Sequence, residues 1–306
     1  MLNFLDKPPK GTDSFLWTDF AELHALIHPD QCFSRGDLVG IENRCNDVGQ
    51  RFDSEKRWRE MSDFSGIRQK EFNMESYPFK ISDDKDTIYL DLDTNNPAQK
   101  FYIGLLIASS MRYIKSKRQG EIARIFEQIC FTLFSCLMPF GSEIRATWAN
   151  GGPEAPYRGT LYQKMVEIAK DIRCTANFKQ RDFKDNDRGD GGIDLISWHC
   201  MSDSREGMPI AFAQCGCSKD DWRFKQLEAS WAKHLRHLPV MHPWATYYFL
   251  PLDLRESDGD WAYKSDIGQA IIVDRLRLLR LASQYKLLDQ LPAMPFIDEV
   301  KAFRYS

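Results

Sequence analysis

An acid and an amide stand at the ends of two neighbouring strand-like runs in the second half of the 306-residue chain. Asp194 is near the start of the run Ile193–His199, and Gln214 is near the end of the run Pro209–Cys217. The turn-forming residues SDSREG separate the two runs, which predicts a hairpin of two largely buried strands. Strict alternation places Ile193 and Asp194 on opposite faces of the sheet. In an antiparallel pair, Asp194 and Gln214 lie at the same end of the sheet, so we expect their side-chain oxygens to converge.

Oxygen ligands from two adjacent strands suit a divalent cation. Asp194 supplies a carboxylate, Gln214 supplies an amide oxygen, and the backbone carbonyl of Cys215 adds another oxygen. Glu127, on a preceding helix, supplies one more. A cation held there polarises a phosphate and lowers the pKa of a bound water. The pattern therefore predicts metal-dependent hydrolysis of a phosphodiester.

The helix that carries Glu127 is predicted over 120–140 by an apolar stripe, which consists of Ile122, Ile125, Phe126, Ile129, Leu133 and Leu137. Cys130, Phe134 and Met138 make the second half of this helix apolar nearly all round, which predicts burial. A carboxylate at the edge of such a region needs a partner, a metal or access to solvent. The alternative for Glu127 is a wet crevice with no ligand.

The remaining elements follow from periodicity and turn residues. We expect helices over 15–30, 98–117 and 159–172, a long helix from about Ser265, a hairpin of Tyr77–Ile81 with Thr87–Leu92, and a strand within 245–254. The polar region 41–75 shows no clear period. After Gln214, the residues Phe224, Leu227, Trp231 and Leu235 predict one helix, which Ser218 and Asp221 would cap.

The composition indicates an ordinary globular protein, with 43% hydrophobic and 28% charged residues. The net charge of -3 excludes general attraction to polyanions, so a nucleic-acid surface must be local or come from a partner. We expect the eight cysteines to be reduced thiols. The absence of a signal-like N-terminus and of a long apolar run predicts a cytoplasmic protein with no membrane partner. Without GxxxxGK[ST] or GxSxG, an ATPase and a serine hydrolase are disfavoured.

The stretches GGIDLI and AQCGC, preceded by the helix IARIFEQIC, resemble the PD-(D/E)xK, or restriction-endonuclease-like, nuclease superfamily over roughly 119–250. They resemble in particular the branch whose second acid is glutamine, as in Mrr-type restriction enzymes and several antiphage defence nucleases. The resemblance implies an α/β fold with a restriction-endonuclease-like core, a mixed central sheet flanked by helices, over 119–290. It leaves an N-terminal α+β region over 1–118 and a C-terminal tail over 291–306.

The resemblance also implies Mg²⁺ or Mn²⁺ as cofactor, DNA as substrate, no small-molecule cofactor, a bacterial antiphage setting and a helicase or ATPase partner. One position departs from the superfamily's pattern, because Gly216 stands where a lysine usually follows the second acid by two residues. Lys225, or failing that Lys219, is expected to reach the site instead and to stabilise charge on the phosphate. The alternative is that both are surface lysines without a role.

Other interpretations stay open. Arg275, Arg277 and Arg280 bind phosphates, form a solvated face or act as salt-bridge partners. His199, Cys200, Cys215 and Cys217 are a candidate zinc site, although the spacing of the last two is unusual for one. We interpret the histidines at 234, 237 and 242 as residues of a helix end and of the loop beside it. Finally, the missing lysine also fits an inactive nuclease-fold module that acts as a binding or scaffold subunit of a larger complex.

Overall fold

The chain forms two compact units in the computed structural model, which describes residues 2, 7–47, 52–148 and 155–303. The first unit comprises Met1–Ile125, Pro251–Lys264 and Asp274–Ser306, and the second comprises Phe126–Leu250 and Ser265–Val273. This division differs from the predicted boundaries, because the segments after Leu250 return to the first unit. The predicted boundary between 118 and 119 lies inside a single helix, α5 (Ser116–Leu137).

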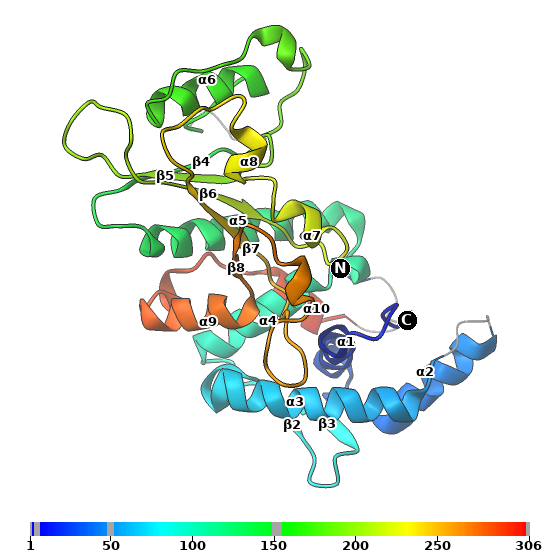
Figure 1. The fold of residues 1–306 in the computed structure, drawn as a ribbon. Helices are drawn as coiled ribbons and strands as arrows, with labels where there is room; N and C mark the ends of the chain where they lie inside the picture. Colours follow the sequence, from blue (N-terminus) through cyan, green and yellow to red (C-terminus); the bar gives the residue numbers. More distant parts are fainter. Residues whose placement is uncertain (1, 3–6, 48–51, 149–154, 304–306) are drawn as a thin grey trace. The chain divides into compact units, whose positions relative to one another are not determined.

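The second unit is built on a five-stranded mixed sheet in the order β4-β5-β6-β7-β8 (Figure 1). The pairs β4–β5 and β5–β6 are antiparallel, whereas β6–β7 and β7–β8 are parallel. The predicted hairpin is thereby confirmed as β5 and β6. The strands are β4 (Glu143–Ala146), β5 (Leu195–Trp198), β6 (Ile210–Cys215), β7 (Ala245–Phe249) and β8 (Ile271–Val273).

Helices cover both faces of this sheet. On one face, Phe134 of α5 packs edge-on against Tyr247 and Phe249 of β7. On the other face, the buried side of α6 (Leu161–Asp171) joins Ile196 and Phe212 in one apolar cluster. A capping box between Thr160 and Gln163 begins α6, which confirms the helix expected over 159–172. The unit is therefore a mixed α/β layer structure.

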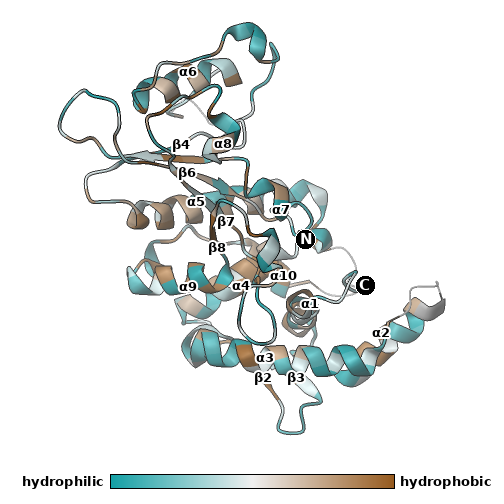
Figure 2. Cartoon of the chain, viewed as in Figure 1, coloured by the Kyte–Doolittle hydropathy of each residue, from teal (hydrophilic) through white to brown (hydrophobic). Residues whose placement is uncertain are grey.

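The first unit contains a three-stranded antiparallel sheet in the order β1-β3-β2 and most of the long helices. The predicted hairpin is confirmed as β2 and β3, and the predicted helix over 15–30 is confirmed as α1. Figure 2 shows hydrophilic colour along much of α2 and α3, which explains why the sequence of 41–75 has no clear period. The elements are α1 (Ser14–Ile27), β1 (Cys32–Ser34), α2 (Arg35–Asp47), α3 (Ser54–Ser76), β2 (Phe79–Ile81), β3 (Thr87–Leu90), α4 (Pro97–Ser109), α9 (Arg275–Gln284) and α10 (Phe296–Lys301).

Two predicted helices are wrong. The long helix expected from Ser265 is instead a 3-10 turn, the strand β8 and then α9, because Ile271–Val273 is a β-branched run and Asp274 caps the helix that follows. The single helix expected around Trp222 is two one-turn helices, α7 (Trp222–Lys225) and α8 (Trp231–His234). Phe224 of its expected apolar stripe is 78% exposed. None of the described helices is both long and apolar enough to cross a bilayer.

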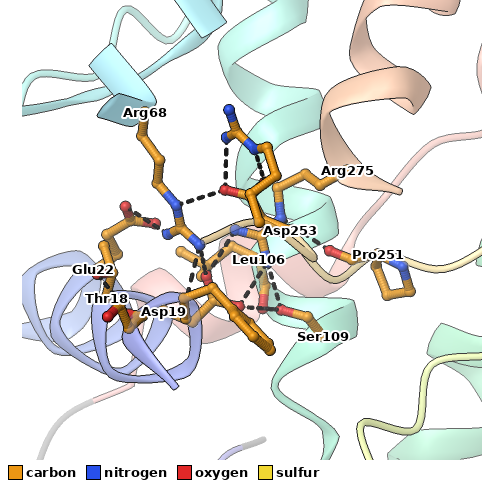
Figure 3. Close-up of polar contacts among 12 residues, drawn as sticks. Thr18, Asp19, Glu22, Arg68, Leu106, Ser109, Pro251, Asp253 and Arg275 are labelled. Atoms are coloured by element: carbon orange, nitrogen blue, oxygen red, sulfur yellow. Dashed lines mark hydrogen bonds and ion pairs between the residues drawn. The ribbon is translucent and has the colours of Figure 1, made fainter. Parts of the chain in front are cut away.

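A buried ion cluster ties together the three chain segments of the first unit (Figure 3). Arg275 donates to both carboxylate oxygens of Asp19, at 2.8 and 2.7 Å, and Arg68 donates to Asp19 at 2.7 Å. Arg68 also binds Asp253 at 2.9 Å and lies 2.9 Å from Glu22. Both guanidinium groups are 0% exposed. Although burial opposes ionisation, the two arginines hold the pKa of Asp19 below its usual value.

This cluster corrects the predicted phosphate-binding role of Arg275, whose guanidinium is fully buried and bound to Asp19 and Ser109. The other two candidate arginines also have protein partners. Arg277 stacks on Trp261 with its guanidinium carbon 4.7 Å from the ring centroid, and Arg280 donates to Glu71 at 2.9 Å.

We predict that Arg275→Ala lowers the free energy of unfolding by about 3–5 kcal/mol, because it leaves buried acid without its partner. Urea unfolding of the full chain measures this loss. Arg280→Ala is the matched control on the same helix, since its ion pair with Glu71 is solvent-exposed and contributes at most about 1 kcal/mol. Equal losses in the two variants would contradict a structural role for the buried cluster.

Candidate active site

Asp194 and Gln214 occupy the same end of the β5–β6 hairpin, as their spacing predicts. Leu195 pairs with Ala213 in the antiparallel register, and Asp194 directly precedes β5. The Asp194 amide donates to the Ala213 carbonyl at 2.9 Å, and the Asp194 carbonyl accepts from the Thr147 amide at 2.8 Å. The backbone of Asp194 is therefore bound on both sides, which fixes the base of its side chain.

Both polar side chains are buried at this strand end. Asp194 is 4% exposed, and its Oδ2 accepts a hydrogen bond from the backbone amide of Cys215 at 2.6 Å. Gln214 is 6% exposed, and its Oε1 has no hydrogen-bond partner among the described residues. A buried carbonyl oxygen without a donor is unusual in a folded protein and points to a group that binds there.

A tight turn before β5 brings a second carboxylate to Asp194. Gly191 and Gly192 have φ values of 70° and 83°, a conformation that side chains other than glycine rarely adopt. A Cβ on Gly192 would lie 2.6 Å from Cβ of Glu228, so this position has no room for a side chain. The Asp190 carboxylate accepts from the Gly192 amide at 2.8 Å, which closes the turn. The glycines of the GDGGID stretch thus serve to fold Asp190 back toward Asp194.

The positive charge around the Asp194 carboxyl is too small to offset its burial and the nearby acids. Burial is the main cause that raises its pKa well above the usual value, and the nearby charges of Asp190 and Glu127 raise it further. The Cys215 amide and the Lys225 ammonium act in the opposite direction but do not prevail. The net result favours the protonated acid unless another cation is present.

The strand faces differ in one respect from the alternation expected. Ile193 packs in the same apolar cluster as Ile196 and Phe212, so the strict alternation does not extend back from β5 to Ile193. Within β6 the alternation holds, because Phe212 joins the cluster under α6, whereas the thiol of Cys215 hydrogen-bonds that of Cys130 on α5. Gln214 therefore shares the face of Phe212, and Cys215 lies on the face of α5.

The structure brings Glu127 and Lys225 into this environment. Glu127 on α5 is half-buried, and its negative charge raises the pKa of Asp194, Cys130 and Cys215. Lys225 is the last residue of the one-turn helix α7, and its positive charge lowers the pKa of Asp194. Lys219 instead lies 3.6 Å from the neighbouring Asp220.

Three further residues belong to this region that the sequence did not single out. Asp190 was visible only as part of the glycine-rich stretch. The Lys164 ammonium, on a residue 2% exposed, donates to the carbonyls of Arg188 and Gly189 at 3.1 Å each, and so holds the segment before the turn. Tyr248 of β7 is paired with Gln214 in the parallel register. Only the strand order reveals that Tyr248 lies beside Gln214.

The candidate zinc residues have separate partners. His199 Nδ1 lies 3.2 Å from the Ser142 hydroxyl, and the Cys200 thiol accepts from Arg173 at 3.3 Å. Of the other histidines, His234 is buried, which lowers its pKa to about 4 and keeps it neutral. In the part of the chain that the structure describes, no three His, Cys, Asp or Glu side chains form a metal-binding group. Gln214 and Cys215 would contribute an amide oxygen and a backbone oxygen, which are not among these side-chain types.

Comparisons with protein-family models, with curated proteins and with solved structures give no match to this chain. The chemistry of the site therefore has to be inferred from its own geometry.

We predict that Asp194→Asn stabilises the metal-free protein at neutral pH. The pKa of Asp194 is higher in the folded than in the unfolded state, so the contribution of this acid to stability is complete below the unfolded pKa and is lost as pH rises through the folded pKa. Asparagine has no such dependence. Unfolding free energies in the presence of a chelator should therefore show an advantage of the variant that is absent near pH 4 and grows as pH rises. An advantage independent of pH would contradict this electrostatic account.

Proposed function

We propose that this protein is a metal-dependent nuclease with a restriction-endonuclease-like core, and that it hydrolyses DNA phosphodiesters at the end of the β5–β6 hairpin. The observation that carries the proposal is the pairing of a buried Asp194 carboxyl with the unpartnered Oε1 of Gln214 on adjacent strands. Two oxygen ligands at one strand end, with a second acid, Glu127, on the packing helix, are the donors that a hard divalent cation takes.

The charges present fit such a cation. The charges of Asp190 and Glu127 raise the pKa of Asp194, and the charge of Lys225 lowers it without offsetting them. A divalent ion would reverse the pKa shift of Asp194 by favouring the ionised carboxylate. The oxygen of Gln214 would gain the partner that it lacks.

Each residue then has a distinct part in the proposed reaction. Asp194 and Gln214 would hold Mg²⁺ or Mn²⁺ at the strand end, with the Cys215 carbonyl as a further oxygen, and Glu127 would reach the ion from the α5 face of the sheet. The bound cation would polarise the phosphate and lower the pKa of a water molecule. The Cys215 amide orients Asp194 through the 2.6 Å hydrogen bond. Lys225, at the end of α7, would stabilise negative charge that develops on the phosphate.

We predict that the full chain cleaves plasmid or single-stranded DNA when Mg²⁺ or Mn²⁺ is present and stops when a chelator is added. Asp194→Asn should lower the cleavage rate by more than about 100-fold, the upper end of the cost of removing a residue that only supports a metal ligand. Gel electrophoresis of time courses at equal protein concentration measures the rate.

Glu143→Gln is the matched control for this experiment. Glu143 is an exposed acid of the same sheet that pairs with Trp198, at the end of β5 opposite to Asp194. This variant should cleave DNA as the wild type does. Cleavage that survives in Asp194→Asn, or that ignores the chelator, would sink the proposal. Absence of both cleavage and Mn²⁺ binding would favour the inactive binding module.

We predict that Lys225→Ala lowers metal-dependent cleavage by about 10²–10³-fold, because a fixed cation beside the scissile phosphate stabilises the developing charge. Lys219→Ala serves as the comparison, since its ammonium is near Asp220. The thermal unfolding midpoint of both variants should match the wild type, because neither lysine is in the buried core. Equal rates in the wild type and Lys225→Ala would remove this lysine from the mechanism.

A further inference from the structure

The glycine that replaces the superfamily's lysine is opposite a tyrosine hydroxyl. A Cβ built on Gly216 would lie 2.5 Å from the Tyr248 hydroxyl oxygen and 3.2 Å from the ring carbon that bears it. Gly216 does not have a positive φ, so the backbone itself would accept alanine or lysine. The side chain of Tyr248 is therefore what excludes a side chain at position 216.

The hydroxyl that occupies this space has no protein partner. Tyr248 is 0% exposed, and its hydroxyl, like Oε1 of Gln214, forms no hydrogen bond with the residues that the structure describes. The two residues are direct neighbours in the parallel register of β6 and β7, so their side chains share one face of the sheet. Two neighbouring residues at the candidate site thus each carry a buried polar atom that no described residue satisfies.

We propose that Tyr248 takes the part that a lysine at position 216 would have, and donates a hydrogen bond to an oxygen of the phosphate bound beside Gln214. This inference rests on the proposed nuclease function and adds the residue that the motif lacks. The phenol is neutral, and so is the amide of Gln214. The site therefore pairs a neutral ligand with a neutral donor, and this arrangement avoids burying the opposite charges that a glutamate and a lysine would bring to these positions.

The geometric half of the inference is tested by stability, without any activity. Gly216→Ala should lower the thermal unfolding midpoint by several degrees in the wild-type background, because the new methyl group overlaps the Tyr248 hydroxyl. In a Tyr248→Phe background the loss should be smaller, since the closest remaining atom is the ring carbon at 3.2 Å. Tyr248→Phe alone should keep or raise the midpoint, because it removes an unsatisfied buried hydroxyl. Equal losses in both backgrounds would overturn the geometry.

The functional half is tested by binding and by rate. Isothermal titration of inorganic phosphate into the full chain with Mg²⁺ should show affinity about tenfold weaker in Tyr248→Phe, the cost of one hydrogen bond to a charged group. Affinity for Mg²⁺ alone should change by less than about twofold, since a neutral phenol is not among the usual ligands of this ion. Single-turnover cleavage should fall by about 10²-fold. Tyr247→Phe is the matched control, because Tyr247 packs on Phe134 at the opposite face of the same strand.

These measurements separate the two proposals. If the wild type cleaves no nucleic acid but its phosphate affinity falls in Tyr248→Phe and not in Tyr247→Phe, the nuclease function is wrong and the role of Tyr248 stands. If the wild type cleaves DNA and Tyr248→Phe binds phosphate and cleaves equally well, the role of Tyr248 is wrong and the nuclease function stands.

Discussion

The contact on which the first unit depends is the ion pair of Asp19 with Arg275, residues that are 256 positions apart in the chain. It joins α1 to α9, and Arg68 extends it to Asp253 in the segment between the two insertions of the second unit. Each of the three chain segments of the first unit contributes at least one charge. Because all of these charges are buried, loss of any partner would leave a charge in a low-dielectric interior. The three chain segments of the first unit therefore have to assemble with every member of the cluster in place.

The parts of the fold that could be predicted from sequence are those with a local signal. The β5–β6 hairpin, the strand β7 and the helix α6 follow from alternation, turn residues and apolar periodicity. A salt-bridge role for Arg275 was one of the alternatives, but its partner could not be predicted, since Asp19 is 256 positions away in the sequence. The strand β8 was missed because its three residues adjoin a strongly helical segment. At the site, Asp190 and Tyr248 needed the turn geometry and the strand order, neither of which is a local property.

Two buried aspartates with opposite pKa shifts show how this chain uses burial for different ends. Burial opposes the ionised form of both, but Asp19 faces two arginines that lower its pKa, whereas Asp194 faces Asp190 and Glu127, which raise it. The charge of Asp19 is thus compensated by residues of the protein itself. Around Asp194, Lys225 does not offset burial and the two acids, and the neighbouring Gln214 oxygen is unsatisfied, so this arrangement is less stable than a fully paired one. Such uncompensated burial is costly for a residue with only a structural role, and strongly shifted pKa values cluster at functional sites. The imbalance at Asp194 is thus the physical argument for a site there, and the balance at Asp19 is the argument for a structural role of the buried ion cluster.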